Sequence, residues 1–213
     1  MLFVPCPKYK EVCMNNIIHL IADYGSGDPA YAEVIQKFLL LDPELRINPV
    51  NVPKFSSLAT GFWISQLATV NPFPRMAIFS NTAPRISVAR DAAQTYKGQY
   101  GHLTYAKLSN GVVAVAVHMG YAFSFIKPLI SELKLINVSN VGSQFRSRDY
   151  YPDGVVGVLR GDKGILGEDV PLGSIPEVPE NRIAFIDGYG NIKTSMRKSQ
   201  IHISEGEKIR IRL

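Results

Sequence analysis

An apolar run that ends in an acidic, glycine-containing loop and leads into a helix is the feature that most constrains the fold. Residues 17–22 are apolar enough to form a strand buried on both faces, as strands of parallel sheets are. Asp28 and Pro29 then suit an N-cap and a first helical residue, and apolar residues recur at helical spacing over 31–41. A buried strand followed at once by a helix is typical of an α/β sheet.

The following segments repeat this alternation. They predict extended structure over 45–52, 76–80, 86–89 and 103–106, and helices over 56–70 and from 155 to 159. The turn signal Ser109-Asn110-Gly111 stops the last of these strands. The apolar segments 112–119 and 129–138 fit either a strand or a helix. We therefore expect an α/β domain whose central sheet is mostly parallel.

The composition changes after this region. Segment 161–179 is rich in glycine, proline and acidic residues and has no sustained hydrophobic period, which indicates a linker. Beyond it, short alternating patterns predict a strand at 182–187 and a hairpin over 200–213. The expected organisation is an N-terminal extension at 1–13, an α/β domain at 14–164, a linker at 165–175 and a small β domain at 176–213.

Bulk composition excludes several classes of protein. The 213 residues suffice for one domain plus a small one, and 46% hydrophobic residues can fill a sizeable core. The longest nearly apolar run, Gly111 to Phe123, is about half a membrane span and is interrupted by His118. Residues 1–13 carry charges and lack a long apolar stretch. We therefore expect a cytoplasmic protein without a membrane segment.

Metal and nucleic-acid sites find little support in the sequence. Cys6 and Cys13 are the two cysteines, which is too few for a four-thiolate metal site. Six cations between Lys193 and Arg212 contribute to a net charge of +5, and such a patch can attract nucleic acid. A solvated strand face is the more usual explanation, and no RNA-binding aromatic motif or zinc finger accompanies the cations. We expect neither a metal nor a nucleic acid as partner.

Asp23 follows the first predicted strand directly. In open α/β sheets, ligands bind in the crevice at the carboxyl ends of strands. A carboxylate there can accept hydrogen bonds from both hydroxyls of a ribose, and Gly25 and Gly27 allow the backbone to approach closely. The alternative is a loop cap, in which Asp23 has no ligand.

The segment Asp187-Gly188-Tyr189-Gly190-Asn191 lies between two predicted β segments. The ring of Tyr189 could stack on a purine, and the amide of Asn191 could bond to a base edge. An ordinary hairpin turn is the alternative, because glycine and asparagine are the usual residues there.

A third segment reads Phe145-Arg146-Ser147-Arg148-Asp149. Neighbouring Arg148 and Asp149 point in different directions in most backbones, which favours plain surface charge. Ser147 could be a nucleophile, but no Gly-x-Ser-x-Gly elbow surrounds it and no histidine motif accompanies it. The chain also lacks a P-loop and a Gly-x-Gly-x-x-Gly fingerprint.

Taken in chain order, these segments resemble motifs of the S-adenosylmethionine hydroxide adenosyltransferases and of the related fluorinases and chlorinases. The similarity runs from about Asn16 to the C-terminus. Asp23-Tyr24-Gly25 is similar to the family's Asp-Phe-Gly, and Ser109-Asn110-Gly111 to its Asp-Asn-Gly or Asn-Asn-Gly turn. Residues 145–149 are similar to Phe-His-Gly-Arg-Asp in the hydrolases and Phe-Tyr-Ser-Arg-Glu in the halogenating enzymes, and residues 187–191 to Asp-x-Phe-Gly-Asn.

The resemblance implies an α/β domain, a C-terminal β-barrel and a homotrimer with sites between subunits. It implies S-adenosylmethionine as the substrate, with no cofactor and no metal. Asp23 would hold the ribose hydroxyls, Tyr189 and Asn191 would contact adenosine, and Asp187 would meet the methionine amine. The remaining roles implied by position are substrate binding by Phe55 and Phe145, and catalysis by Asn81, Arg85, Arg146 and Ser147.

Two of the three groups with which the hydrolases position water differ here. Asn81 stands at the position of an Asp and Arg146 at that of a His, whereas Arg85 matches. Asparagine cannot act as a base, and arginine stays protonated. The family's late Asn-Ser-x-Gly segment has no counterpart, so we expect a shortened C-terminal domain. Two functions stay open: hydrolysis to adenosine and methionine, or an inactive homologue that binds a ligand or builds an oligomer.

Overall fold

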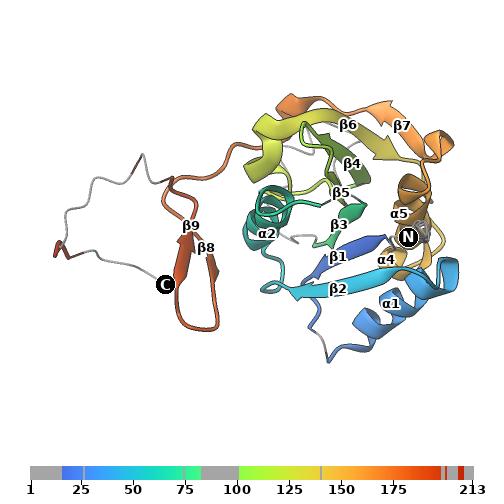
Figure 1. The fold of residues 1–213 in the computed structure, drawn as a ribbon, viewed down its shortest axis with the longest axis horizontal. Coiled ribbons are helices and arrows are strands. Elements are labelled where there is room, and N and C mark those ends of the chain that lie inside the picture. Colours follow the sequence, from blue (N-terminus) through green and yellow to red (C-terminus); the bar gives the residue numbers. More distant parts are fainter. Residues whose placement is uncertain are drawn as a thin grey trace, which may run out of the picture.

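The computed structural model describes residues 16–25, 27–73, 75–82, 101–139, 141–197, 200 and 206–208. These residues form an α/β fold with a seven-stranded sheet and a separate two-stranded sheet (Figure 1). The strands are β1 (Ile17–Ala22), β2 (Arg46–Asn51), β3 (Met76–Asn81), β4 (Leu103–Leu108), β5 (Val113–Val117), β6 (Ile130–Ile136), β7 (Leu166–Asp169), β8 (Ile183–Ile186) and β9 (Ile192–Thr194). The helices are α1 (Pro29–Leu41), α2 (Ser57–Thr69), α4 (Arg146–Asp149) and α5 (Tyr151–Leu159), with 3-10 turns η1 (Ser124–Leu129), η2 (Lys163–Ile165) and η3 (Leu172–Ser174).

The predicted beginnings and ends of the first two helices are confirmed. Asp28 caps α1, because its side chain accepts a hydrogen bond from the backbone N–H of Ala30 at 2.9 Å. Ser56 caps α2 in the same way, with its hydroxyl 3.2 Å from the N–H of Ala59. Local capping chemistry thus sets where each helix begins.

The large sheet is mixed rather than mostly parallel. Its strand order is β2-β1-β3-β5-β4-β6-β7, and β2, β1, β3 and β5 run parallel to one another. The pairs β5–β4, β4–β6 and β6–β7 are antiparallel. The turn at 109–111 explains the change of direction, because so short a connection joins only antiparallel neighbours. Gly111 has a φ of 86° in this turn, a conformation that glycine adopts without steric cost.

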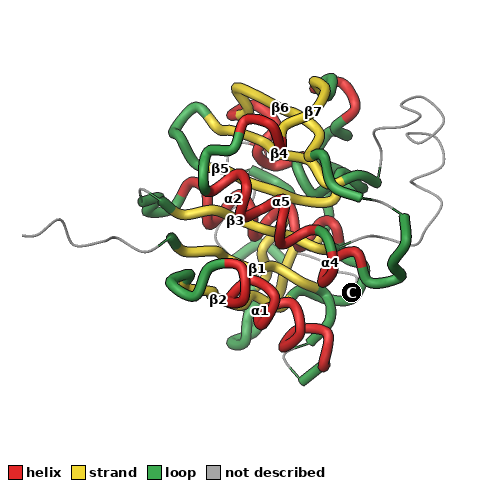
Figure 2. Tube along the Cα trace, turned by 90° about the vertical axis from the view of Figure 1, so that its right-hand side faces the viewer, coloured by secondary structure: helices red, strands yellow, loops and turns green. Residues whose placement is uncertain are grey.

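Helices cover the two faces of the sheet. Figure 2 shows α1, α4 and α5 in front of the strands, where Phe38 of α1 and Val155 of α5 share a core with Phe79 of β3. On the opposite face, Ile64 of α2 and Ile126 of η1 lie in the second core. Two cores on one sheet explain why its central strands are apolar on both sides.

The segment 165–175 differs from the linker that we expected. It contains β7, which pairs antiparallel with β6, and the turn η3. The Nζ of Lys134 lies 2.7 Å from Oδ1 of Asp169 across this pair. Strand β7 reads Leu-Gly-Glu-Asp and sits at the sheet edge, so it needs no hydrophobic alternation, and only its pairing with β6 makes it a strand.

The C-terminal unit is a two-stranded antiparallel sheet of β8 and β9, which stands to the left of the large sheet in Figure 1. No β-barrel is present among the residues that the structure describes. Phe185 of β8 attaches the hairpin to α2: its ring stacks on Phe62 at 6.3 Å and meets Trp63 edge-on at 5.4 Å. The predicted extension at 1–13 and strand at 86–89, and most of the predicted hairpin at 200–213, lie outside the described residues.

The apolar run 111–123 forms β5 and the loop after it. Within the described ranges, no helix is long and apolar enough to cross a membrane. His118, at the end of this strand, is buried, with its Nε2 3.3 Å from the hydroxyl of Ser174 and its ring 6.0 Å from that of Phe123. Burial lowers the pKa of His118 to about 4.

Stability should therefore fall as the pH drops from about 6.5 to about 4. The unfolded chain takes up a proton on His118 near pH 6.5, whereas the folded state takes it up only near its lowered pKa of about 4. The contribution is complete above pH 6.5, and about 3 kcal/mol of the free energy of unfolding is lost by pH 4. Urea unfolding should show that the free energy of unfolding falls more steeply with decreasing pH in the wild type than in His118→Gln. Equal slopes would contradict the prediction.

Candidate functional site

The carboxyl ends of β1 and β3 bring together residues that the sequence placed far apart. Ala22 pairs in register with Asn81, and Asp23 and Thr82 follow the two strands. Alternation along the strands places Asp23 and Thr82 towards the α2 face and Tyr24 and Asn81 towards the α1 and α5 face. The carboxyl ends of β1 and β3 therefore lie side by side, with polar groups on both faces of the sheet.

Asp23 is tied to the loop that precedes α2. Its Oδ2 accepts a hydrogen bond from the backbone N–H of Phe55 at 2.8 Å. Phe55 has a φ of 61°, a conformation that costs a non-glycine residue about 1–2 kcal/mol. Its ring remains 44% exposed. Two residues that were predicted to bind substrate are therefore in direct contact, although Asp23 is also a loop cap.

Tyr24 links three parts of the chain. Its ring meets that of Tyr31 at 5.3 Å, and its hydroxyl is buried. Burial raises the pKa of Tyr24 to about 12, against an opposing hydrogen-bonding influence from the nearby side chains of Asn81 and Ser147. Even so, the hydroxyl makes no hydrogen bond of ordinary geometry within the part of the chain that the structure describes. Asn81 and Ser147, both predicted as catalytic, thus meet around a group that the sequence analysis treated only as part of a motif.

Thr82 carries a second buried hydroxyl at the carboxyl ends of β1 and β3. The residue is 1% exposed, and its Oγ1 has no hydrogen-bond partner among the described residues. An unsatisfied buried hydroxyl costs about 1–3 kcal/mol, so each such group requires an explanation. With Tyr24, two hydroxyls of this kind lie at the ends of adjacent strands. A polar ligand or an ordered water molecule at the edge would satisfy them.

Arg148 and Asp149 face each other, contrary to the expectation that they diverge. The Nε and Nη2 of Arg148 lie 2.7 and 3.2 Å from the two carboxylate oxygens of Asp149, and Nη1 lies 2.9 Å from Glu33 of α1. Ser143 also donates a hydrogen bond to Asp149. The single helical turn of α4 makes this geometry possible. The hydrogen bonds from Arg148 and then Ser143 lower the pKa of Asp149 to about 2.

This ion-pair network fixes α4 against α1. The guanidinium of Arg148 lies 4.9 Å from the centre of the Phe145 ring, which is 53% exposed. That of Arg146 lies 6.0 Å from the ring of Tyr151. The charged residues of α4 thus have a structural role, which holds Ser147 beside Tyr24. Arg85, the remaining predicted catalytic residue, lies outside the described residues.

Asp187 organises the turn between β8 and β9. Its Oδ1 accepts hydrogen bonds from the N–H groups of Tyr189 and Asn191 at 3.0 and 2.9 Å, and its Oδ2 accepts one from the Asn191 side chain at 2.9 Å. Lys193 lies 3.7 Å away. The hydrogen bond from the Asn191 side chain is the main cause that lowers the pKa of Asp187. Both oxygens are thus used within the turn.

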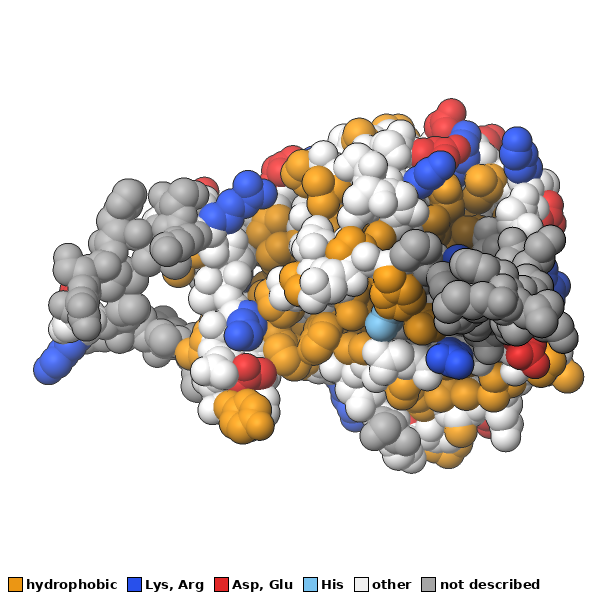
Figure 3. Space-filling view, in the orientation of Figure 1, with side chains coloured by type: hydrophobic (Ala, Val, Ile, Leu, Met, Phe, Trp, Pro, Cys, Tyr) orange, Lys and Arg blue, Asp and Glu red, His pale blue; other side chains and the backbone are white. Residues whose placement is uncertain are grey.

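The turn presents Tyr189 to solvent. This side chain is 96% exposed. The hairpin is attached through Phe185 to the middle of α2, and Figure 3 shows hydrophobic side chains gathered between the hairpin and the large sheet. Among the described residues, no hydrogen bond or ring contact joins Tyr189 or Asn191 to Asp23 or Asn81. One chain therefore does not assemble all of the predicted site.

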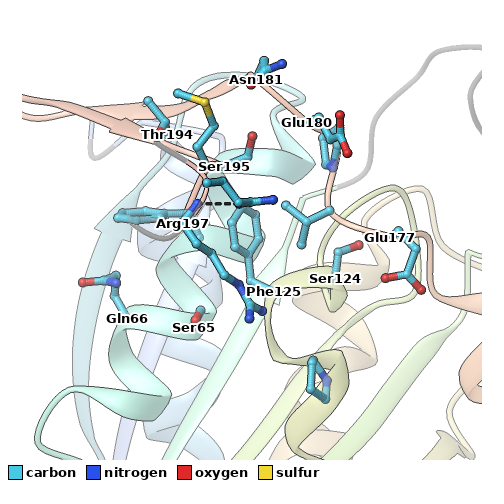
Figure 4. Close-up of a pocket in the computed structure, with 16 residues that line it drawn as sticks. Ser65, Gln66, Ser124, Phe125, Glu177, Glu180, Asn181, Thr194, Ser195 and Arg197 are labelled. Carbon is cyan, nitrogen blue, oxygen red and sulfur yellow. Dashed lines mark hydrogen bonds between the residues drawn. The ribbon is translucent and has the colours of Figure 1, made fainter. Parts of the chain in front are cut away.

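A cleft of about 820 Å³ lies between the hairpin and the large sheet. Figure 4 shows the Arg197 side chain reaching into it towards Ser65, with Phe125 alongside. Its walls come from α2, η1 and the segments before β8 and after β9. The lining residues are Phe62, Ser65, Gln66, Ser124, Phe125, Pro128, Glu177, Val178, Pro179, Glu180, Asn181, Thr194, Ser195, Met196, Arg197 and Gln200. No sequence motif indicated this cleft, because it arises from the packing of the hairpin on α2.

Comparison with known proteins supports the fold. No family model and no curated protein matches the sequence. Among solved structures, an uncharacterized conserved protein from Thermotoga maritima matches with a TM-score of 0.64 and 14% identity, over 86% of this chain and 73% of that chain. A conserved hypothetical protein from Thermus thermophilus matches with a TM-score of 0.60 and 14% identity, over 85% of this chain and 74% of that chain. At this identity the similarity shows a shared fold and no shared chemistry.

Proposed function

We propose that this chain binds S-adenosylmethionine at the carboxyl ends of β1 and β3 and hydrolyses it to adenosine and methionine. One observation carries the proposal: Asp23 lies at the carboxyl ends of β1 and β3 on the α2 face, Tyr24, Asn81 and Ser147 lie at the same strand ends on the opposite face, and two buried hydroxyls at these strand ends lack partners among the described residues. The resemblance to the S-adenosylmethionine hydroxide adenosyltransferases supports the choice of ligand.

The ribose would bind to Asp23. A carboxylate has about four lone-pair positions, so the single bond from the Phe55 N–H leaves capacity for both ribose hydroxyls. Because Phe55 follows β2 and is partly exposed, its ring offers an apolar wall beside the sugar. The hydrogen bonds from the ribose hydroxyls to the Asp23 carboxylate would be charge-assisted, and their burial would strengthen binding.

The adenine contacts would come from a second copy of the chain. Tyr189 is almost fully exposed, and Asp187 pre-forms the turn that presents it together with Asn191. Such a preformed aromatic turn suits stacking on a purine. We propose a homotrimer in which the turn of one subunit covers the Asp23 edge of the next. Asp187 then acts mainly by orienting the turn.

The proposed reaction is displacement at C5′. The oxygen of water forms a bond to C5′ as the C5′–S bond breaks. The electron pair of the C5′–S bond stays on sulfur. Methionine leaves as a neutral thioether, adenosine keeps the new hydroxyl, and one proton passes to solvent. No general acid is needed, so catalysis rests on alignment and on exclusion of bulk water. In this proposal, Asn81 and Ser147 would hold the water.

One incubation tests both open functions. The purified protein is mixed with S-adenosylmethionine, with and without halide, and the products are separated to detect adenosine, halogenated nucleoside and methionine. Calorimetry with adenosine is run in parallel. Release of adenosine and methionine in equal amounts supports the hydrolase. Adenosine binding without methionine release favours the inactive homologue, which the changes at Asn81 and Arg146 would explain. Absence of both binding and release overturns the proposal.

A further inference from the structure

We infer that Tyr24 is a further catalytic residue, which donates a hydrogen bond to the attacking water while Asn81 and Ser147 each accept a hydrogen bond from one of its two O–H groups. The inference rests on the proposed hydrolase function and names the group that holds the nucleophile. It concerns a residue to which the sequence motifs assign no role in the reaction. Tyr24 stands where the similar motif has phenylalanine, so its hydroxyl is a feature of this chain.

Three elements place the hydroxyl. Tyr24 follows β1 on the face of the sheet occupied by α1 and α5, and Asn81 ends β3 on the same face, opposite Ala22. Ser147 arrives from α4, which Arg148 fixes to α1 through Glu33. The Tyr31 ring, at 5.3 Å and an interplanar angle of 72°, limits how far the Tyr24 ring can turn. The hydroxyl is thus held in place.

The side chains of Asn81 and Ser147 lie near the Tyr24 hydroxyl but do not satisfy its hydrogen-bonding capacity. The Tyr24 hydroxyl is buried and has no hydrogen bond of ordinary geometry among the described residues, although Asn81 and Ser147 are near enough to influence its ionisation. A buried group of this kind normally has a partner. The atom that completes this set must therefore be small and polar, as the oxygen of a water molecule is.

The chemistry of the three groups suits a water that attacks carbon. Burial raises the pKa of Tyr24 to about 12, so the phenol is neutral and can donate at neutral pH. The amide oxygen of Asn81 and the hydroxyl oxygen of Ser147 can accept hydrogen bonds from the two O–H groups of the water. Its second lone pair is then free to point at C5′. Asn81 and Ser147 thus orient the water without acting as bases, which fits the loss of a carboxylate at position 81.

The test compares Tyr24→Phe with Tyr105→Phe. Both substitutions remove a phenol hydroxyl and keep the ring, but Tyr24 follows β1 at the proposed site, whereas Tyr105 lies on β4, outside it. We expect Tyr24→Phe to bind adenosine within about threefold of the wild type and to lower kcat for methionine release by about 100-fold at unchanged KM. Tyr105→Phe should keep the wild-type kcat. In Tyr24→Phe/Ser147→Ala, the two losses should be less than multiplicative, because both act on one water.

Several results would overturn the inference. An unchanged kcat in Tyr24→Phe does so directly. A fall in kcat that is matched by weaker adenosine binding, or fully multiplicative losses in the double variant, indicates a structural role instead. A wild type that binds adenosine but releases no methionine removes this inference and leaves the binding function standing. A wild type that does neither removes both, so the two failures are distinguishable.

Discussion

Replacing Asp23 with asparagine is expected to weaken adenosine binding by about 100-fold, which corresponds to about 2.7 kcal/mol. Asparagine keeps one oxygen that can accept the Phe55 N–H bond, so the loop before α2 should keep its place. It loses the charge and the second acceptor that both ribose hydroxyls require. Asp23→Ala, which also leaves the Phe55 N–H without this acceptor, should show no measurable binding in calorimetry.

A ligand without the ribose hydroxyls makes this experiment specific. The affinity of 2′,3′-dideoxyadenosine should be low and nearly equal for the wild type and Asp23→Asn, because neither can form the bonds in question. Asp153→Asn is the matched control: it removes a carboxylate from α5 that pairs with Lys37 at 3.2 Å, away from the strand ends. The assignment of Asp23 fails if adenosine binds equally to the wild type and Asp23→Asn.

Gly61→Ala is expected to destabilise the protein by about 3 kcal/mol, although alanine is the better helix former. Gly61 lies in the middle of α2 where the helix crosses the segment after β5. A Cβ atom at this position would lie 2.2 Å from the carbonyl oxygen of Tyr121 and 3.1 Å from the ring of Phe125. A backbone oxygen cannot turn aside as a side chain can, so α2 would have to move away from η1.

Gly157→Ala in α5 provides the control for helix propensity. The closest atom to its Cβ would be Cγ1 of Ile165 at 3.3 Å, which belongs to a side chain that can adjust. Its free energy of unfolding should stay within about 1 kcal/mol of the wild-type value. Thermal unfolding followed by circular dichroism separates the two cases, with a melting temperature about 10 °C lower for Gly61→Ala. Similar melting temperatures for the two variants would show that α2 is not tightly packed at Gly61.

Gly61 also shows how far local sequence rules extend. Judged by helix propensity alone, this glycine weakens α2, yet the predicted helix forms and the residue is required by a close approach of the backbone. The segments 112–119 and 129–138 show the same limit, since both remained undecided until pairing with β4 made strands of them. Strand identity in short apolar segments depends on neighbours that are distant in the sequence.

The candidate site, like the fold, was predictable from the sequence only in part. Asp23 was recognisable because it follows a buried strand, and ligands bind at the carboxyl ends of strands in open α/β sheets. Asn81, the last residue of β3, was indicated only by the resemblance to the adenosyltransferases. Tyr24 was not recognisable, because an aromatic residue after a strand gives no signal of where its hydroxyl will lie. Ser147 comes from a helix that an ion pair between Arg148 and Glu33 holds in place, and no local pattern encodes that contact.

The sequence by itself determined the local structure: which segments are buried, where α1 and α2 begin at Asp28 and Ser56, and that the chain turns back at Gly111. These features follow from hydrophobic period and capping, which act over a few residues. The tertiary structure alone decided that the sheet is mixed, that 166–169 joins it as β7, and that Tyr24, Asn81 and Ser147 meet. The physical reason is that strand order and side-chain convergence are set by long-range packing on the sheet, to which local rules do not extend.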